Sequence, residues 1–198
     1  MTQQLLSGLI AYAFVTSITP GPNNLMLMTS GANYGFRRTV PHMLGVSLGF
    51  VVMAAVLGAG LVQLFSAFPV SYTVLKILSV IYMIWLAWKI ANTAATPDPA
   101  KETSQSITFL QACAFQWVNP KAVAMALTAL TNYAPDHSFS ASLLVCAIFG
   151  AVNLPSVGSW VLVGQQMQRL LTSQTRLRSF NITMALLLLA SLYPVLRA

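Results

Sequence analysis

The chain has 198 residues, of which 57% are hydrophobic and 7% charged, and its mean hydropathy is +0.72. Because a soluble domain carries about 25% charged residues, this composition excludes a soluble globular enzyme and predicts a polytopic membrane protein. The formal net charge of +7 reflects ten Lys and Arg residues against three acids, and the basic residues cluster in short loops between apolar segments, which is typical of membrane orientation rather than of nucleic-acid binding.

Six apolar segments are long enough to cross a bilayer, which takes about 20 residues in a straight helix. They run over residues 5–34, 39–65, 70–91, 107–133, 139–166 and 177–196. The sequence therefore predicts an all-α membrane protein with a single transmembrane domain over residues 1–198. The polar stretch 93–106 contains Thr96-Pro97-Asp98-Pro99 and is predicted to link two halves, 1–92 and 107–198.

The first span is interrupted by Thr19-Pro20-Gly21-Pro22-Asn23-Asn24. Proline removes a backbone N–H and clashes with the preceding turn, so the helix cannot continue through this segment. In lipid, the backbone groups released by a break have no water to bond. The break is therefore predicted to be buried in protein or to line a polar cavity, as in the binding sites of transporters.

Basic residues follow the first, third and fifth spans, and they predict the orientation of the chain. They are Arg37, Arg38, Lys89, Lys101, Arg169, Arg176 and Arg178. Positive loops stay in the cytoplasm, so both termini are expected on the outer side, which is the periplasm for a multi-pass protein of a bacterial inner membrane. Lys76, near the outer end of the third span, is interpreted as a snorkelling side chain.

The second span contains Gly45-Val46-Ser47-Leu48-Gly49, which spells the nucleophile-elbow pattern of hydrolases. That motif requires a strand–turn–helix context, whereas here it lies in an apolar helix. Small residues four apart favour close helix packing instead. This face permits a homodimer, and it equally permits packing within one chain.

The fourth span is broken at Val118-Asn119-Pro120-Lys121. Each of the two breaks leaves roughly 11 to 13 residues on either side, or about 16 to 20 Å of helix, so both fall near the midplane. The two broken spans run in opposite directions. This arrangement predicts a 3+3 inverted repeat, with helices 1 and 4 broken at the midplane and a site between the halves.

The breaks suggest the chemistry of that site. Pro22 and Pro120 suit the first turn of a helix, so each second half-helix aims free N–H groups and a partial positive charge at the midplane. Lys121 adds a full charge, and no acidic residue lies in any span to neutralise it. A site of this charge favours a carboxylate as its ligand. Lys121 is also the titratable side chain placed to carry a coupling proton. Capping of Lys121 by backbone carbonyls is the alternative.

Amide side chains surround the same breaks and provide both donors and acceptors. The unpaired carbonyls at the ends of the first half-helices suit an ammonium group, so the site is predicted to bind a small zwitterionic amino acid. Simple capping of the broken backbone is the alternative role for each asparagine, and Asn153 is a cavity residue or part of a proline kink. The predicted substrate-binding residues are Thr19, Pro20, Gly21, Pro22, Asn23, Asn24, Gln116, Asn119, Pro120, Lys121 and Asn153.

The sequence resembles the LysE/RhtB family of amino-acid exporters over nearly its whole length. The motifs that carry the resemblance are Pro20-Gly21-Pro22-Asn23-Asn24, Gly35-Phe36-Arg37, Gly45-Val46-Ser47-Leu48-Gly49, the aromatic-rich run 82–89 and Asn119-Pro120-Lys121. The run 85–90 also resembles the cysteine/O-acetylserine exporter branch. The resemblance implies a six-helix inner-membrane exporter that is driven by the proton-motive force and moves small amino acids outward. The family's Pro-Gly-Pro and Asn-Pro-Lys positions fall on Pro20, Gly21, Pro22, Asn119, Pro120 and Lys121.

Other functions remain open from the sequence. A passive channel or ion carrier would need charged rings or carbonyl filters, an intramembrane hydrolase would need a base within reach of Ser47, and a structural membrane partner would need only the small-residue faces. The cysteines Cys113 and Cys146 offer no metal-ligand spacing. No metal, other cofactor or nucleic acid is expected as a partner, whereas the lipid bilayer is.

Overall fold

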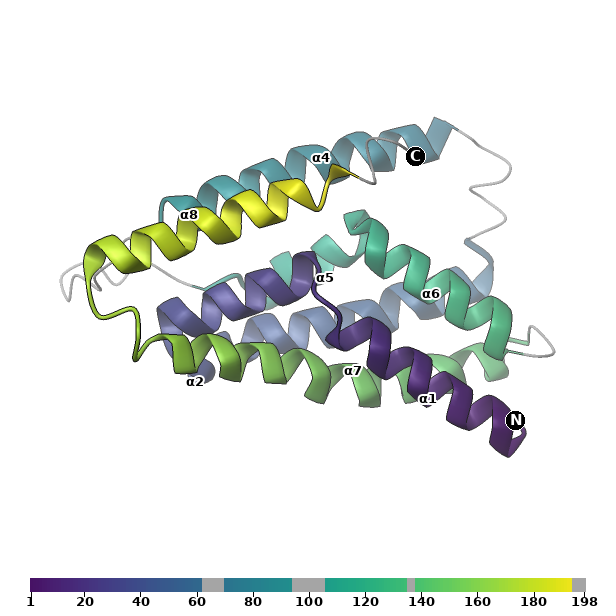
Figure 1. The fold of residues 1–198 in the computed structure, drawn as a ribbon. Helices are drawn as coiled ribbons and strands as arrows, with labels where there is room; N and C mark the ends of the chain where they lie inside the picture. Colours follow the sequence, from purple (N-terminus) through teal and green to yellow (C-terminus); the bar gives the residue numbers. More distant parts are fainter. Residues whose placement is uncertain (62–69, 94–105, 135–137, 194–198) are drawn as a thin grey trace.

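The computed structural model describes residues 1–61, 70–93, 106–134 and 138–193, and every regular element in these ranges is a helix (Figure 1). The elements are α1 (Gln3–Ile18), α2 (Pro22–Val56), a short π-helix η1 (Leu57–Leu61), α4 (Val70–Ala91), α5 (Phe109–Val118), α6 (Pro120–Tyr133), α7 (Phe139–Met167) and α8 (Gln174–Ala190). Most of the predicted linker 93–106, and the ends of the predicted second and sixth spans, lie outside the described residues.

Helix α1 ends where the prolines begin. The Thr2 side chain caps its start by accepting a hydrogen bond from the Leu5 N–H at 3.3 Å. After Ile18 the backbone is extended, and Pro22 opens α2 as its first residue. Proline suits this position because its fixed φ matches the helix and its missing N–H would have had no partner. Three non-helical residues thus separate two helices in the first predicted span.

Helix α2 consists of two limbs that meet at Gly35. This glycine has φ 77° and ψ 172°, a left-handed conformation that glycine adopts without the penalty of a Cβ atom. The chain turns back there, and Ser30 of the first limb (22–34) contacts His42 of the second limb (36–56). Arg37 and Arg38 are exposed in the first turn of the second limb.

Helices α5 and α6 repeat the pattern of α1 and α2. A capping box between Thr108 and Gln111 starts α5, and Asn119 then leaves the helical conformation with φ −87° and ψ 104°. Pro120 opens α6, again as a first-turn proline. In the fourth predicted span, therefore, a single extended residue separates two short helices.

Helix α7 holds the fold together by its long contact with α2. The two helices approach at backbone distance, because a Cβ atom at Gly164 would collide with the carbonyl of Met28 and one at Gly31 with the carbonyl of Val161. The second limb of α2 meets α5 in the same way through Gly45 and Gly49. Helices α4 and α8 lie side by side as an outer pair (Figure 1).

Two apolar clusters fill the interior. The first surrounds Leu86 and Phe115 and joins α4, α5 and α8 to the first limb of α2. The second surrounds Leu9 and Phe149 and joins α1 and α6 to the second limb. Helix α7 contributes side chains to both clusters. Two helix interruptions, residues 19–21 between α1 and α2 and Asn119 between α5 and α6, carry polar residues that lie where these clusters meet.

The outer faces of the helices are apolar. Large hydrophobic side chains are widely exposed, with Ile81 at 59%, Leu186 at 61% and Leu110 at 74%. Soluble monomers rarely expose contiguous apolar surface on this scale, whereas a bilayer solvates it. By length and composition, the segments 22–60 and Phe139–Met167 could cross a membrane, and Gln3–Ile18 is a shorter apolar helix.

Candidate functional site

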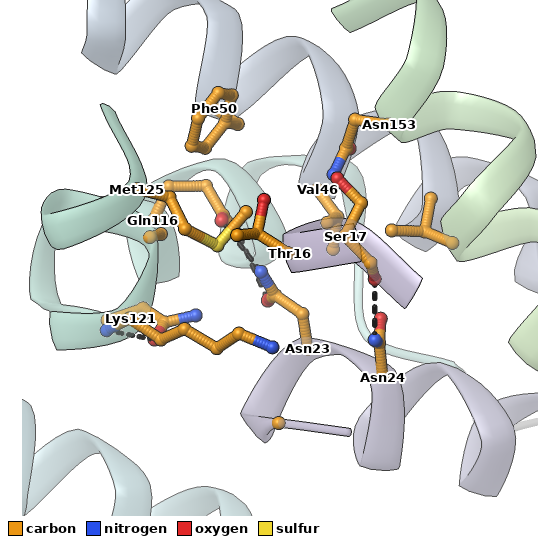
Figure 2. Close-up of a pocket in the computed structure, with 14 residues that line it drawn as sticks. Thr16, Ser17, Asn23, Asn24, Val46, Phe50, Gln116, Lys121, Met125 and Asn153 are labelled. Carbon is orange, nitrogen blue, oxygen red and sulfur yellow. Dashed lines mark hydrogen bonds between the residues drawn. The ribbon is translucent and has the colours of Figure 1, made fainter. Parts of the chain in front are cut away.

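A polar pocket lies where the two interruptions approach each other (Figure 2). It encloses about 350 Å³ of empty space, counted together with its open mouth. Its lining comes from α1, both limbs of α2, α5, α6, α7 and the two interruptions, and consists of Thr16, Ser17, Gly21, Asn23, Asn24, Val46, Phe50, Gln116, Asn119, Lys121, Ala122, Met125, Asn153 and Val157. The lining thus combines apolar side chains with amides, hydroxyls and one ammonium group.

Lys121 reaches across the pocket from α6 to the first interruption. Its Nζ donates hydrogen bonds to the carbonyl of Thr19 at 2.7 Å and to that of Pro20 at 3.4 Å. The alternative role predicted for this lysine, capping of free carbonyls, is therefore the one it has in this conformation. Because Lys121 joins residues about 100 positions apart, its ammonium group ties the two interruptions together.

Gly21 makes room for this lysine. A Cβ atom built at Gly21 would lie 2.8 Å from Cδ and 3.0 Å from Nζ of Lys121. Real Cβ atoms do not approach other heavy atoms so closely, so any larger residue would displace the lysine. The glycine is needed here for close approach, since its φ of −176° is ordinary extended backbone.

Three carbonyls at the end of α1 already have hydrogen-bond partners. Asn24 Nδ2 donates to the carbonyls of Ser17 at 2.8 Å and Thr19 at 2.9 Å, and Trp160 Nε1 donates to that of Ile18 at 3.0 Å. The prediction that these carbonyls stay free for a substrate ammonium group is therefore wrong for Ser17, Ile18 and Thr19 in this conformation. Backbone acceptors inside a membrane protein must be satisfied, and the chain satisfies these with its own side chains.

Asn23 and Gln116 connect the two interruptions a second time. Asn23 Nδ2 donates to Gln116 Oε1 at 2.8 Å, and Gln116 Nε2 donates back to Asn23 Oδ1 at 3.1 Å. Gln116 is completely buried and also donates to the carbonyl of Ala112 at 2.9 Å. The reciprocal pair fixes the orientation of both amides, so this side of the pocket is preformed.

Asn119 caps α6 with its side-chain oxygen, and its amide NH₂ group is a further donor. Its Oδ1 accepts from the Lys121 N–H at 3.2 Å, while its amide NH₂ group has no hydrogen-bond partner among the described residues. At the other interruption Gly21 offers no side-chain cap to the first turn of α2. Both helix starts therefore present donors and partial positive charge near the pocket.

The side-chain oxygen of Asn153 is a buried hydrogen-bond acceptor without a partner among the described residues. The Nδ2 atom of the same side chain donates to Ser17 Oγ at 3.0 Å. The residue is only 4% exposed. An unpaired buried oxygen costs about 1–3 kcal/mol, so a ligand that donates a hydrogen bond to it gains correspondingly.

The pocket includes most of the residues predicted from the sequence. Gly21, Asn23, Asn24, Gln116, Asn119, Lys121 and Asn153 line it. Thr19, Pro20, Pro22 and Pro120 are not among the lining residues; the first two offer their carbonyls to Lys121, and the two other prolines begin helices. The lining residues that were not predicted are Thr16, Ser17, Val46, Phe50, Ala122, Met125 and Val157.

Those additional residues differ in how visible they are in the sequence. Ser17 is a polar residue two positions before the break, which is a local signal that could have identified it. Val46, Phe50 and Met125 are ordinary apolar residues of apolar helices. Only the crossing of α2, α6 and α7 brings them to the pocket.

In the part of the chain that the structure describes, no base bonds to the serine of the hydrolase-like motif. Ser47 is 2% exposed, and its Oγ donates to the carbonyl of Gly150 in α7 at 3.4 Å. The ring of His42 contacts Ser30 instead, with 3.0 Å between Nδ1 and Oγ. Gly45 and Gly49 adjoin α5, so this motif serves close contact between helices of one chain.

An all-helical body with apolar outer faces, built around a polar pocket at two helix interruptions, defines a membrane transport protein rather than an enzyme. The LysE type translocator profile matches residues 14–190. The chain therefore belongs to the LysE type translocator family. No solved structure matches it.

Curated relatives agree with this assignment. The cysteine/O-acetylserine efflux protein of Escherichia coli K12 is 32% identical over 190 residues, which are 95% of each chain. The protein of the same name from Escherichia coli O139:H28 is 31% identical over 191 residues, 96% of each chain. That from Shigella sonnei is 32% identical over 190 residues, again 95% of each chain.

Proposed function

We propose that this protein exports small zwitterionic amino acids or their derivatives from the cytoplasm, with the pocket at the two interruptions as the substrate site. The observation that carries the proposal is the pairing of a cationic end with an unpaired acceptor in one pocket. The efflux activity named for the relatives supports the direction of transport. We infer an inner-membrane location in a bacterium, with both termini periplasmic, from the basic residues after Gly35, between α7 and α8, and at the start of α8.

The two ends of the pocket match the two ends of an amino acid. Lys121 Nζ and the free amide NH₂ group of Asn119 are donors for a carboxylate, and Asn153 Oδ1 is an acceptor for an ammonium group. Val46, Phe50 and Met125 offer an apolar wall for a short side chain. The wall favours small amino acids of the cysteine or O-acetylserine size over charged ones.

The interruptions also suggest how transport is achieved. We infer that α1 with the first limb of α2, and α5 with α6, are two broken spans related by a 3+3 inverted repeat, which rock around the pocket. Lys121 and the Asn23–Gln116 pair cross between these spans, so they must rearrange when the halves move. If protons drive export, Lys121 is the pocket residue that could exchange a proton for the substrate.

Export is tested most directly in cells. A strain that produces the chain is expected to accumulate L-cysteine or O-acetyl-L-serine in the medium faster than a matched strain without it. A collapse of the proton gradient by an uncoupler should stop this accumulation. Metabolite profiling of the medium with no amino acid enriched would contradict the proposal.

Asn153 provides a test of ammonium recognition. Replacing Asn153 with alanine is expected to raise the half-saturating concentration of L-cysteine about tenfold, because one hydrogen bond to a charged group contributes about 1.5 kcal/mol or more. The measurement is uptake into inside-out membrane vesicles. Asn132→Ala, an exposed position near the end of α6, is the matched control and is expected to behave like the wild type. Equal constants in both variants would exclude Asn153 as the ammonium acceptor.

A passive channel is the second candidate function. The described residues contain neither a ring of charges nor a ring of carbonyls, which are the usual filters. Saturable flux with competition between amino acids is expected of a carrier, whereas flux that rises linearly with concentration would favour the channel.

The bilayer and a second copy of the chain are the partners we propose besides the substrate. The exposed apolar side chains provide the lipid contact. A homodimer remains a prediction, and the Gly45 and Gly49 face is not its interface, because α5 covers that face within the chain. Cross-linking of a protein labelled on the outer pair α4 and α8 would test for a dimer.

A further inference from the structure

A second pocket opens beside the end of α4. It encloses about 300 Å³ of empty space together with its mouth. The polar residues that line it are Thr29, Ser30, Asn33, Tyr34, Lys89 and Thr93, from the first limb of α2, the end of α4 and the residues after it. Nothing in the transport function described above uses this pocket.

Lys89 is the cation of this pocket. Its side chain is half-buried, its Nζ lies 3.5 Å from Gln111 Oε1, and the Trp85 ring centroid is 5.6 Å from the same atom. Both neighbours are neutral, and the three acidic residues of the chain lie outside the described residues. A half-buried ammonium group that faces a cavity with neutral neighbours attracts an anion.

Three polar residues of this pocket are held by hydrogen bonds. Thr29 and Ser30 are each 4% exposed; Thr29 donates to the carbonyl of Leu25 at 2.7 Å, and Ser30 contacts His42 Nδ1 at 3.0 Å. Asn33 is held by a reciprocal pair of hydrogen bonds with Asn181 of α8, at 2.8 and 3.0 Å. The polar groups of the pocket are therefore oriented by hydrogen bonds, and Leu86, Ile90 and Ile107 complete its lining.

The second pocket lies on the way from the Gly35 turn to the first pocket. Asn24 lines the first pocket and Thr29 the second, five residues further along the same helix limb, or about 7.5 Å at 1.5 Å per residue. Arg37 and Arg38 follow the turn at the far end of this limb. With those arginines on the cytoplasmic side, the second pocket is the cytoplasmic one of the two.

The geometry points to a second binding site, in which Lys89 receives the carboxylate of the amino-acid substrate on the cytoplasmic side before it reaches the first pocket. This inference rests on the proposed export function. The site raises the local concentration of anionic groups at the mouth, and it leaves the transport step in the first pocket unchanged.

Replacing Lys89 with glutamine tests this role. In inside-out vesicles, we expect the half-saturating concentration of L-cysteine to rise about tenfold, as for the loss of about 1.4 kcal/mol, with the maximal rate unchanged. Cysteamine, which is cysteine without its carboxylate, should inhibit wild type and variant equally. Lys89→Arg keeps the charge and should keep the wild-type constant. Lys76→Gln, the same change on the same helix, is the matched control.

Two results would overturn the inference. One is a Lys89→Gln variant with the constants of the Lys76→Gln control, or with an equal change for cysteamine. The other concerns Asp98 and Glu102, which lie outside the described residues. If Lys89→Gln no longer changes the half-saturating concentration in a protein that also carries Asp98→Asn and Glu102→Gln, Lys89 serves an internal ion pair. Wild-type vesicles that transport no amino acid would refute the proposed function itself, and this inference with it.

Discussion

Replacing Lys121 with methionine is expected to lower gradient-driven export at least about 100-fold while the protein still folds. The methionine keeps the length and apolar stem of the lysine, but it removes the ammonium group that bonds the carbonyls of Thr19 and Pro20. Hydrogen bonds to a charged group contribute about 1.5–3 kcal/mol, and 2.8 kcal/mol corresponds to about 100-fold. The initial rate of L-cysteine uptake into energised inside-out vesicles measures the effect.

A second assay separates the two roles of the lysine. Exchange of labelled for unlabelled L-cysteine across the membrane needs substrate binding but no proton gradient. If Lys121 holds the substrate, both exchange and net export should be lost in the methionine variant. If it only carries the proton, exchange should survive. Lys76→Met on α4 is the matched control, and full export by Lys121→Met would show that the lysine has neither role.

Replacing Gly164 with alanine is expected to have the largest effect on folding. The added Cβ atom would collide with the carbonyl of Met28, so α7 and α2 would have to separate along their longest contact. Contact between membrane helices depends on van der Waals packing, because lipid supplies no hydrophobic force between them. Overpacking of this kind typically costs about 1–3 kcal/mol or more, and backbone atoms cannot yield as a side chain can. We expect little monodisperse protein after extraction in detergent.

Gly158→Ala provides the matched control for this prediction. It makes the same change on the same helix, but its Cβ atom would meet only the Met43 sulfur at 3.3 Å. That sulfur sits on a flexible side chain, so the neighbour can move aside. The two variants should therefore differ in yield and in thermal unfolding temperature, with Gly158→Ala near the wild type. A Gly164→Ala protein as stable as Gly158→Ala would show that the α2–α7 contact is not tight.

Much of the helical order follows from local rules in the sequence. Prolines at positions 20, 22 and 120 end one helix and begin the next, because proline removes a donor and fixes φ. The predicted segment 70–91 coincides with α4, and the start of α7 lies at the predicted residue 139. The capping asparagine at position 119 is likewise a local effect, since its side chain bonds an N–H two residues away.

The pairing of the site residues required the tertiary structure. Asn23 and Gln116, or Lys121 and Thr19, are about 100 residues apart, and no local pattern says which donor meets which acceptor. The sequence also could not tell that Asn24, Trp160 and Lys121 would bond the carbonyls of residues 17–19, or that Asn153 Oδ1 would be a buried acceptor without a partner. Competition among several donors for few acceptors is decided by distance, and distance is a property of the fold.

Composition and proline placement alone thus determined that this protein is a helical membrane protein, and where prolines end one helix and begin the next, because water, lipid and backbone geometry act on each segment locally. The packing of the helices decided the rest. The crossing of α2, α6 and α7 brings Val46, Phe50 and Met125 to the first pocket, and the placement of α4 brings Lys89 to the second pocket together with Ser30. Those arrangements depend on which glycines allow two helix backbones to come into contact. These contacts form only when the helices pack.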